Sequence, residues 1–171
     1  MLLLIVRHAD AGDSEEWAKT GRPDGLRPLS TKGVEQMRAA AKGLVALLPE
    51  VDLIVTSPYT RAAQTAEIIL AAYGGKVAEE TTRTLEPEED PEKFEAWLKE
   101  HADNDVVIAV GHEPQLGILA TWLMTGEASR RVEMKKGSAC LLEFGKRPKK
   151  GTGVLNWLMT PRQLMAHGGG S

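Results

Sequence analysis

Five side chains suited to binding and transferring an anion follow three short apolar segments of the sequence. They are Arg7, His8, Ser57, Arg61 and His112. The planar guanidinium of arginine matches two phosphoryl oxygens at once and stays charged at any working pH. An imidazole can attack phosphorus when the attacking nitrogen is neutral and the other nitrogen is held by a hydrogen bond. The residue types therefore predict chemistry on a phosphoryl group, provided that the fold brings the three positions together.

We predict a separate role for each kind of side chain among these five residues. His8 is predicted to be the nucleophile, and Arg7 and Arg61 are predicted to share the binding of the phosphoryl oxygens. Ser57 is expected to help bind the substrate, and His112, if protonated, to add a further donor. The transition state of phosphoryl transfer spreads negative charge over the equatorial oxygens, so cations and donors fixed in advance can supply most of the catalysis. This design requires no metal and no other cofactor.

The segments that must position these residues alternate between strand and helix patterns. Apolar runs of strand length lie at 2–6, 52–56 and 106–110. Helical patterns lie between and after them, at 30–48, 60–72, 91–101 and 114–125. Such alternation predicts an α/β fold, a three-layer sandwich with a mainly parallel central sheet flanked by helices. Ligands of such sheets bind outside the carboxyl ends of the strands, where the five residues would meet.

Three further features complete the expected domain. Residues 139–144 and 154–159 are predicted to pair antiparallel at an edge of the sheet. Residues 11–28, which are polar and contain glycine and proline, are expected to form a loop that is either a lid or plain mobile surface. We expect one catalytic domain over residues 1–162 and a flexible tail over 163–171.

Composition narrows the possible partners and compartments. The 171 residues are 42% hydrophobic and 26% charged, which is typical of one globular domain. A formal net charge of −3 gives no general attraction to nucleic acid or to an anionic membrane. No apolar run approaches the roughly 18–20 residues of a membrane-spanning helix. The one cysteine, Cys140, excludes an internal disulfide and fits a reducing compartment. We expect a cytoplasmic monomer.

Each candidate residue taken alone has an ordinary structural explanation. A histidine or an arginine at a strand end more often makes surface hydrogen bonds than it catalyses a reaction. His101 is expected at a helix C-terminus, where a cation is favoured, and His167 in the tail, so both are predicted to be structural. The functional prediction for His8 depends on Arg61 and His112 occupying neighbouring strand ends.

Four motifs, in this order, resemble those of one protein family. They are Leu-Ile-Val-Arg-His-Ala-Asp at 4–10, Pro-Leu-Ser at 28–30 with Gly33, Ser-Pro-Tyr-Thr-Arg-Ala-Ala-Gln-Thr-Ala at 57–66 and Val-Gly-His-Glu-Pro at 110–114. Over almost its whole length the chain resembles the histidine phosphatase superfamily, specifically its short bacterial phosphohistidine phosphatase (SixA-type) branch. The resemblance implies a phosphoglycerate mutase-like fold.

The same resemblance implies a mechanism and a class of substrate. His8 would be phosphorylated during turnover, Arg7, Arg61 and His112 would hold the phosphate, and water would then hydrolyse the intermediate. The partner it implies is a phosphorylated protein, with phosphohistidine on a signalling phosphocarrier as the substrate.

The chain departs from the family pattern at two points. Ala9 stands where the family commonly has glycine, a change that a negative φ would tolerate. Larger members take a general acid from a helical insertion that short members largely lack, and here Glu86 is the first candidate, followed by Asp10 and Glu113. Alternatively no strong acid is needed, because phosphohistidine departs readily, and residues 86–92 are then a solvated acidic loop.

Three other functions are compatible with parts of the pattern. The same mechanism could act on a small phosphomonoester or a nucleotide, although an open site suits a protein-borne phosphoryl group better. The arginines and His112 could bind a phosphorylated partner without turnover, but binding alone needs no nucleophile. A metal hydrolase could use His8 with Asp10 and His112 with Glu113. These pairs lack the helical spacing of zinc ligands, and the two arginines would repel a divalent cation.

Overall fold

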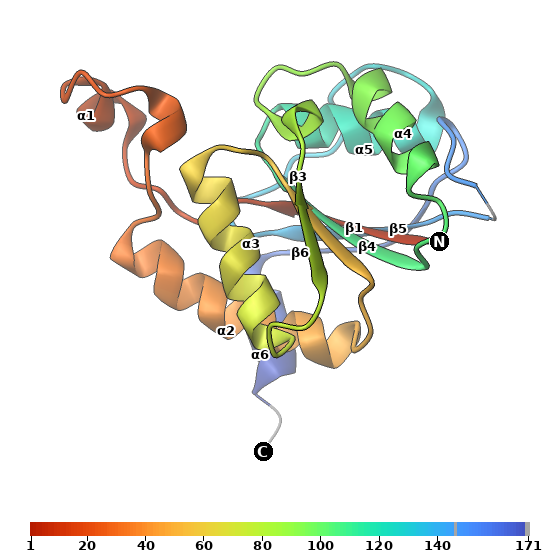
Figure 1. Cartoon of the computed structure of the whole chain (residues 1–171), viewed down its shortest axis with the longest axis horizontal. Helices are drawn as coiled ribbons and strands as arrows, with labels where there is room; N and C mark the ends of the chain where they lie inside the picture. The colour runs from red at the N-terminus through yellow and green to blue at the C-terminus, as the bar shows by residue number, and fades with distance from the viewer. Residues whose placement is uncertain (146, 170–171) are drawn as a thin grey trace.

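A six-stranded mixed sheet forms the centre of the molecule (Figure 1). The structure is a computed structural model and describes the chain apart from residues 146, 170 and 171. The strands are β1 (Leu2–Arg7), β2 (Leu53–Thr56), β3 (Ala78–Thr81), β4 (Val106–Gly111), β5 (Ala139–Glu143) and β6 (Val154–Met159). Their order is β3-β2-β4-β1-β5-β6, parallel from β3 to β1 and antiparallel from β1 to β6. The predicted α/β fold with a mainly parallel sheet is confirmed, as is the antiparallel edge pair.

Helices cover both faces of this sheet and make three layers (Figure 1). One face carries α2 (Thr31–Leu47), α3 (Thr60–Ala72) and α6 (Pro161–Gly168), and the other carries α4 (Pro91–Glu100) and α5 (Gln115–Thr125). Two single 3₁₀ turns, η1 (Asp24–Leu26) and η2 (Arg83–Leu85), and a short helix, α1 (Ser14–Ala18), lie in the connections. Within the described part of the chain, no helix combines the length and apolar character that crossing a membrane requires.

Strand β1 is buried on both faces. Leu4 and Val6 belong to the core on the α2 and α3 side, whereas Leu3 and Ile5 belong to the core on the α4 and α5 side. All four side chains are fully buried. The sequence of a strand covered by helices on both faces is a continuous apolar run without alternation. This is the pattern from which β1 was predicted. This double burial fixes the point at which the chain leaves the sheet and the polar residues begin.

Strand β3 lies at the edge of the sheet and was not delimited by the sequence analysis. It reads Ala-Glu-Glu-Thr, all four residues are exposed, and it pairs in parallel with β2. An edge strand with no buried side chain carries no apolar run, so a hydrophobic pattern does not reveal it. Acidic side chains on such an edge also discourage pairing with other chains.

Helix α6 corrects the expectation of a flexible tail over 163–171. Thr160 caps the helix, and Leu164 is fully buried in the same core as α2. The two helices approach so closely that a Cβ built on Gly43 would lie 1.9 Å from the Leu164 carbonyl oxygen. The expected boundary at residue 162 therefore cuts through a packed helix, while residues 170 and 171 lie outside the described part of the chain.

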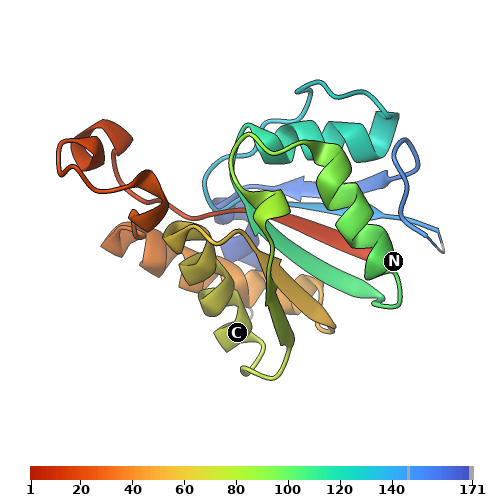
Figure 2. The ribbon, with the colours of Figure 1, turned by 45° about the horizontal axis from the view of Figure 1, so that its top comes forward.

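Residues 11–28, called the arm below, follow β1 directly. Figures 1 and 2 both show the arm, in red and orange, projecting from the rest of the molecule beyond the carboxyl end of β1. It was predicted as a loop, but it contains α1, capped by the Asp13 carboxylate, and the turn η1. Within residues 11–28, only Ala11 and Arg27 are buried.

Candidate active site

Parallel pairing places the predicted site residues at one edge of the sheet. Strand β4 lies between β1 and β2, with Arg7 opposite Gly111 and Thr56 opposite Val110. The residues that follow these strands are therefore neighbours. The ring centroids of His8 and His112 are 5.1 Å apart, and Arg61 reaches His8 from the first turn of α3. The structure thus brings together the three strand ends as the sequence analysis predicted.

His8 is held in one tautomer. Its Nδ1 lies 2.7 Å from the Ala9 carbonyl oxygen. Because a carbonyl oxygen can only accept a hydrogen bond, Nδ1 carries the proton and Nε2 keeps its lone pair. The Arg61 Nε–H donates to that same Nε2 at 3.3 Å, which agrees with this assignment. Ala9 has no positive φ, so alanine fits the turn.

The protonation state of His8 also favours a nucleophile. Burial lowers the pKa of His8 to about 3, the charges of Arg61 and Arg7 act in the same direction, and the hydrogen bond to Ala9 opposes them. Only 5% of the residue is exposed. His8 is therefore a neutral imidazole at neutral pH, with its lone pair on Nε2.

His112 is buried against Ser57 and Tyr59. Its Nε2 lies 2.9 Å from Ser57 Oγ, and the Tyr59 ring meets it edge-on with centroids 5.1 Å apart. Burial, together with the neighbouring His8 and Arg61, lowers the pKa of His112 to about 2. The predicted donor role of His112 is conditional on protonation, and the protein alone keeps this ring neutral. Its Nδ1 is buried and has no hydrogen-bond partner within the described ranges.

Arg7 is fixed by the segment between α5 and β5. Its Nη1 donates to the Met134 carbonyl oxygen at 2.7 Å, and its buried Nε has no partner among the described residues. Burial lowers the pKa of Arg7 and the nearby Glu113 opposes this shift, but a guanidinium remains protonated in proteins. Met134 occupies only one of the two Nη atoms of Arg7, and the charge of Arg7 acts on His8.

Comparison with known proteins agrees with this arrangement. The family model of the histidine phosphatase superfamily (branch 1) matches residues 3–86. An uncharacterised protein of Picosynechococcus sp. is 35% identical over 147 residues, which are 85% of this chain and 86% of that protein. The chain belongs to the histidine phosphatase superfamily. The phosphohistidine phosphatase SixA of Escherichia coli is 28% identical over 96% of both chains.

The solved structures include a SixA protein histidine phosphatase complexed with tungstate. It superposes on this histidine phosphatase with a TM-score of 0.81 and 27% identity, covering 96% of this chain and 99% of that one. The match confirms the fold and supports a phosphatase.

Two candidate general acids of this histidine phosphatase are engaged in other contacts. Asp10 accepts hydrogen bonds from Lys136 and Ser30, which lower the pKa of its carboxyl to about 2. Glu113 accepts the Met134 N–H at 2.8 Å, and so it fixes the segment whose carbonyl holds Arg7. The other oxygen of Glu113, Oε2, lies 3.4 Å from Arg130 Nε and has no hydrogen-bond partner among the described residues.

Glu86, the first candidate for the acid, lies beside the end of β4. It follows Leu85, whose carbonyl oxygen would lie 3.2 Å from a Cβ built on Gly111. The Glu86 carboxylate faces Arg83 at 3.8 Å, and within the described ranges it makes no hydrogen bond to His8. Its role as an acid stays a prediction.

The side chains of the described residues do not form a cluster of metal ligands. Within the part of the chain that the structure describes, no three histidine, cysteine, aspartate or glutamate side chains converge as metal ligands would. Asp10, once paired with His8 as a possible ligand, is instead bound to Lys136 and Ser30.

The structure adds two residues to the site that the sequence analysis gave no role. The Thr65 Oγ1 accepts the Ala9 N–H at 3.1 Å and donates to the Arg61 carbonyl at 2.7 Å. Because Thr65 lies one helical turn after Arg61 within a recognised motif, the helical period is a signal that could have found it. Asp24 pairs with Arg61 at 2.9 Å, but it lies 37 residues away in a segment with no apolar pattern.

Proposed function

We propose that the protein is a metal-independent phosphatase that removes phosphate from a phosphohistidine of a signalling phosphocarrier protein, through a phosphohistidine intermediate on its own His8. The observation that carries the proposal is the tautomer of His8. The Ala9 carbonyl holds the proton on Nδ1, and this leaves the Nε2 lone pair between Arg61 and His112.

The first step transfers the phosphoryl group to His8. The Nε2 lone pair forms a bond to phosphorus while the bond from phosphorus to the nitrogen of the substrate imidazole breaks. That nitrogen keeps the electron pair and takes up a proton from bulk water, which the second step returns. The His8 ring, which still carries its Nδ1 proton, becomes positive as the new bond forms. The Ala9 carbonyl, 2.7 Å from Nδ1, stabilises this charge.

The second step returns the enzyme to its starting state. A water molecule attacks the phosphorus of phosphorylated His8, the bond from phosphorus to Nε2 breaks, and Nε2 recovers its lone pair. The products are inorganic phosphate and a proton. The charge of both transition states falls on the phosphoryl oxygens, which Arg7, Arg61 and His112 face.

Two buried polar atoms support phosphate as the ligand. Arg7 Nε and His112 Nδ1 are two of six buried side-chain atoms that have no hydrogen-bond partner among the described residues, although a buried polar atom without a partner is unfavourable. Both residues flank His8, and phosphoryl oxygens would satisfy both atoms. Arg7, Arg61 and His112 are therefore proposed as the phosphate-binding residues, and Ser57 as the residue that orients His112.

The engagement of Asp10 and Glu113, two of the three candidate acids, favours phosphohistidine over an alkyl phosphate. Asp10 is ionised, and Glu113 is bound to the Met134 N–H. A phosphohistidine leaving group departs readily without a strong acid, whereas an alkoxide requires protonation. The relative SixA is named a phosphohistidine phosphatase, and its likeness to this chain extends over 96% of both proteins.

The substrate is tested by a panel of phosphorylated compounds. Initial rates are compared for a phosphohistidine protein, an aryl phosphate, sugar phosphates and nucleotides, with His8→Ala as the matched control. We expect the highest kcat/KM with the phosphohistidine protein and no turnover with His8→Ala. Faster turnover of a sugar phosphate or a nucleotide would refute the proposed substrate. Turnover that persists in His8→Ala, or none in the native protein, would refute the phosphatase mechanism.

A further inference from the structure

Arg61 is bound on two sides by different groups. Its Nη2 lies 2.9 Å from the Asp24 Oδ2, and its Nη1 donates to the Asp24 carbonyl oxygen at 2.9 Å. Its Nε–H points the other way, to the Nε2 of His8 at 3.3 Å. Asp24 belongs to the turn η1 of the arm, so a residue outside the sheet and the large helices contacts the arginine of the site.

Asp24 occupies one edge of the guanidinium, and the adjacent edge faces His8. A guanidinium carries five N–H groups in one plane. Asp24 uses the edge formed by Nη1 and Nη2. The Nε–H and the second N–H of Nη2 form the adjacent edge, which faces His8. A phosphoryl group on Nε2 of His8 would meet this second edge, so it need not displace Asp24.

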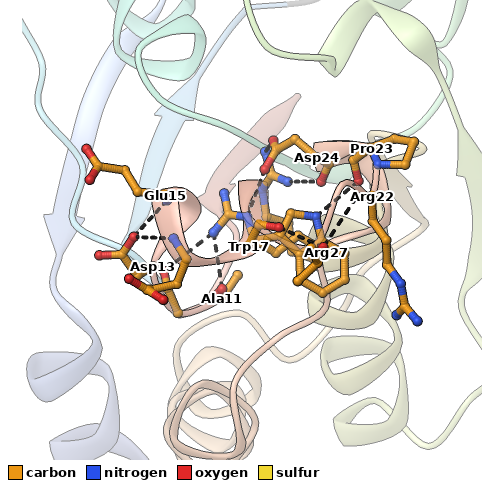
Figure 3. Close-up of polar contacts among 12 residues, drawn as sticks. Ala11, Asp13, Glu15, Trp17, Arg22, Pro23, Asp24 and Arg27 are labelled. Atoms are coloured by element: carbon orange, nitrogen blue, oxygen red, sulfur yellow. Dashed lines mark hydrogen bonds and ion pairs between the residues drawn. The ribbon is translucent and has the colours of Figure 1, made fainter.

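Asp24 is itself held by a buried arginine. The Arg27 Nε donates to the Asp24 Oδ1 at 2.8 Å, and the Arg27 Nη1 donates to the Ala11 carbonyl oxygen at 3.1 Å. Arg27 is only 8% exposed. Figure 3 shows Arg27 between Ala11 and Asp24, with the rest of the arm around them. Each carboxylate oxygen of Asp24 thus meets a different guanidinium.

The charge of Asp24 fits this position. Desolvation raises the pKa of the Asp24 carboxyl, but the hydrogen bond from Arg27 and the charge of Arg61 outweigh it, so the pKa is lowered overall. The carboxylate is therefore ionised at neutral pH. The turn η1 is also packed in place, because Gly25 lies against the Tyr59 ring, and that ring lies 5.0 Å from the Arg61 guanidinium.

We propose that Asp24 is a positioning residue, which fixes one edge of Arg61 so that the other edge is presented to the phosphoryl group on His8, and that Arg27 in turn fixes Asp24. The proposal rests on the phosphatase function proposed above. It gives the arm a defined purpose, since the arm supplies the group that orients a phosphate-binding arginine. The contacts disfavour two other roles of Asp24. A general acid would need a proton, and a latch that blocks phosphate would occupy the edge facing His8.

The test compares Asp24→Asn with Asp13→Asn. Both replace a carboxylate of the arm by an amide of the same size, but Asp13 caps α1 and does not contact Arg61. The affinity for inorganic phosphate and for tungstate is measured by calorimetry, and kcat/KM is measured on aryl phosphates with good and poor leaving groups. Because a hydrogen bond to a charged group is lost, we expect Asp24→Asn to weaken both affinities and kcat/KM by about 5- to 50-fold. Asp13→Asn should leave all three within about twofold.

A double-mutant cycle with Arg61→Lys distinguishes a role through Arg61 from a general structural effect. If Asp24 acts only by orienting the guanidinium, Asp24→Asn in the Arg61→Lys background should change phosphate affinity by less than about twofold. Equal losses in the two backgrounds would refute the proposal. The melting temperature of each variant is recorded, so that a loss of folded protein is not mistaken for a loss of orientation.

Three other results for Asp24→Asn would refute the positioning role of Asp24. Tighter phosphate binding by Asp24→Asn would identify a latch and refute a positioning role. A loss confined to poor leaving groups, with phosphate affinity intact, would identify a general acid and refute it equally. Unchanged affinity would refute it directly. Phosphate affinity does not depend on turnover, so failure of the proposed phosphatase function would be seen separately, as a native protein that binds phosphate without hydrolysing the aryl phosphates.

Discussion

At the scale of single residues, the two site histidines link catalysis to stability. Both are buried and neutral, and their pKa values lie near 3 for His8 and 2 for His112. The same burial that keeps the His8 lone pair free for attack prevents either ring from taking up a proton in the folded chain. An unfolded chain has no such restraint, and its histidines titrate near pH 6.5.

This difference predicts that stability falls in mild acid. For each histidine the folded pKa is depressed, so between about pH 3 and 6.5 the unfolded chain binds more protons than the folded one. The contribution is fully present above pH 6.5 and is lost as the pH falls. Urea unfolding at pH 7 and pH 5 should show a loss of up to about 2 kcal/mol per histidine.

The control for this prediction is a variant without the two buried imidazoles, His8→Gln with His112→Asn. Its free energy of unfolding should vary less between pH 7 and pH 5, because most carboxyl groups titrate below that range. Equal stability of the native protein at the two pH values would contradict the assignment of neutral, buried histidines.

At the scale of elements, the start of α2 is docked on the segment that follows His8. Ser30 caps the helix by accepting the Gly33 N–H, and its own N–H donates to the Asp10 carbonyl oxygen at 2.9 Å. A Cβ built on Gly33 would lie 2.1 Å from that carbonyl oxygen. Glycine is therefore required for the close approach of the helix to the backbone beside the nucleophile.

Gly33→Ala should consequently destabilise the protein and lower its activity. The clash is with backbone, so either the helix or the 8–10 segment must move, and overpacking of this kind costs about 1–3 kcal/mol. Glu35→Ala, at an exposed position of the same helix, should stay within about 0.5 kcal/mol. Urea unfolding and kcat/KM of both variants provide the measurement. A Gly33→Ala protein with native stability and activity would contradict the close contact.

The sequence predicts the strands whose side chains are buried. It does not reveal an exposed edge strand or a polar contact between distant segments. Strands β1, β2 and β4 are apolar runs because helices cover both of their faces, and the residues after them converge because parallel strands end at one edge. Strand β3 has four exposed residues and no apolar signal. The pairing of Asp24 with Arg61 joins positions 37 residues apart, and only the packed fold brings them together.

At the scale of the whole molecule, the extent of the folded unit depends on α6. The domain boundary predicted at residue 162 falls inside α6, and the single catalytic domain stays a prediction. The structure places Leu164 in the core that includes Met37 and Ala40 of α2. The helix therefore completes one face of the sheet, and its eight residues contribute to the stability of the domain.

Leu164→Ala should lower the free energy of unfolding by about 2–5 kcal/mol, as expected for truncation of a fully buried leucine. Arg162→Ala changes an exposed residue of the same helix and should have an effect within about 0.5 kcal/mol. Denaturant unfolding of the two variants measures the difference. Similar stabilities would show that α6 is dispensable and would restore the boundary near residue 162.

Positive charge is concentrated at the proposed phosphate-binding site, although the protein as a whole is negative. The chain has a net charge of −3, yet Arg7, Arg61 and Arg27 gather at the carboxyl ends of the strands, where two of the three are almost fully buried. An anion is therefore attracted by the site and not by the protein as a whole. Local charge of this kind suits recognition of one phosphoryl group.

The most direct test of a covalent intermediate on His8 is to trap the phosphorylated enzyme. The native protein and His8→Ala are mixed with a labelled phosphoryl donor, quenched within the first turnovers, and the label on the protein is measured after acid and after base. We expect a label on the native protein that is lost in acid and stable in base, and none on His8→Ala. A label that survives acid, or an equal label on His8→Ala, would contradict a phosphohistidine on His8.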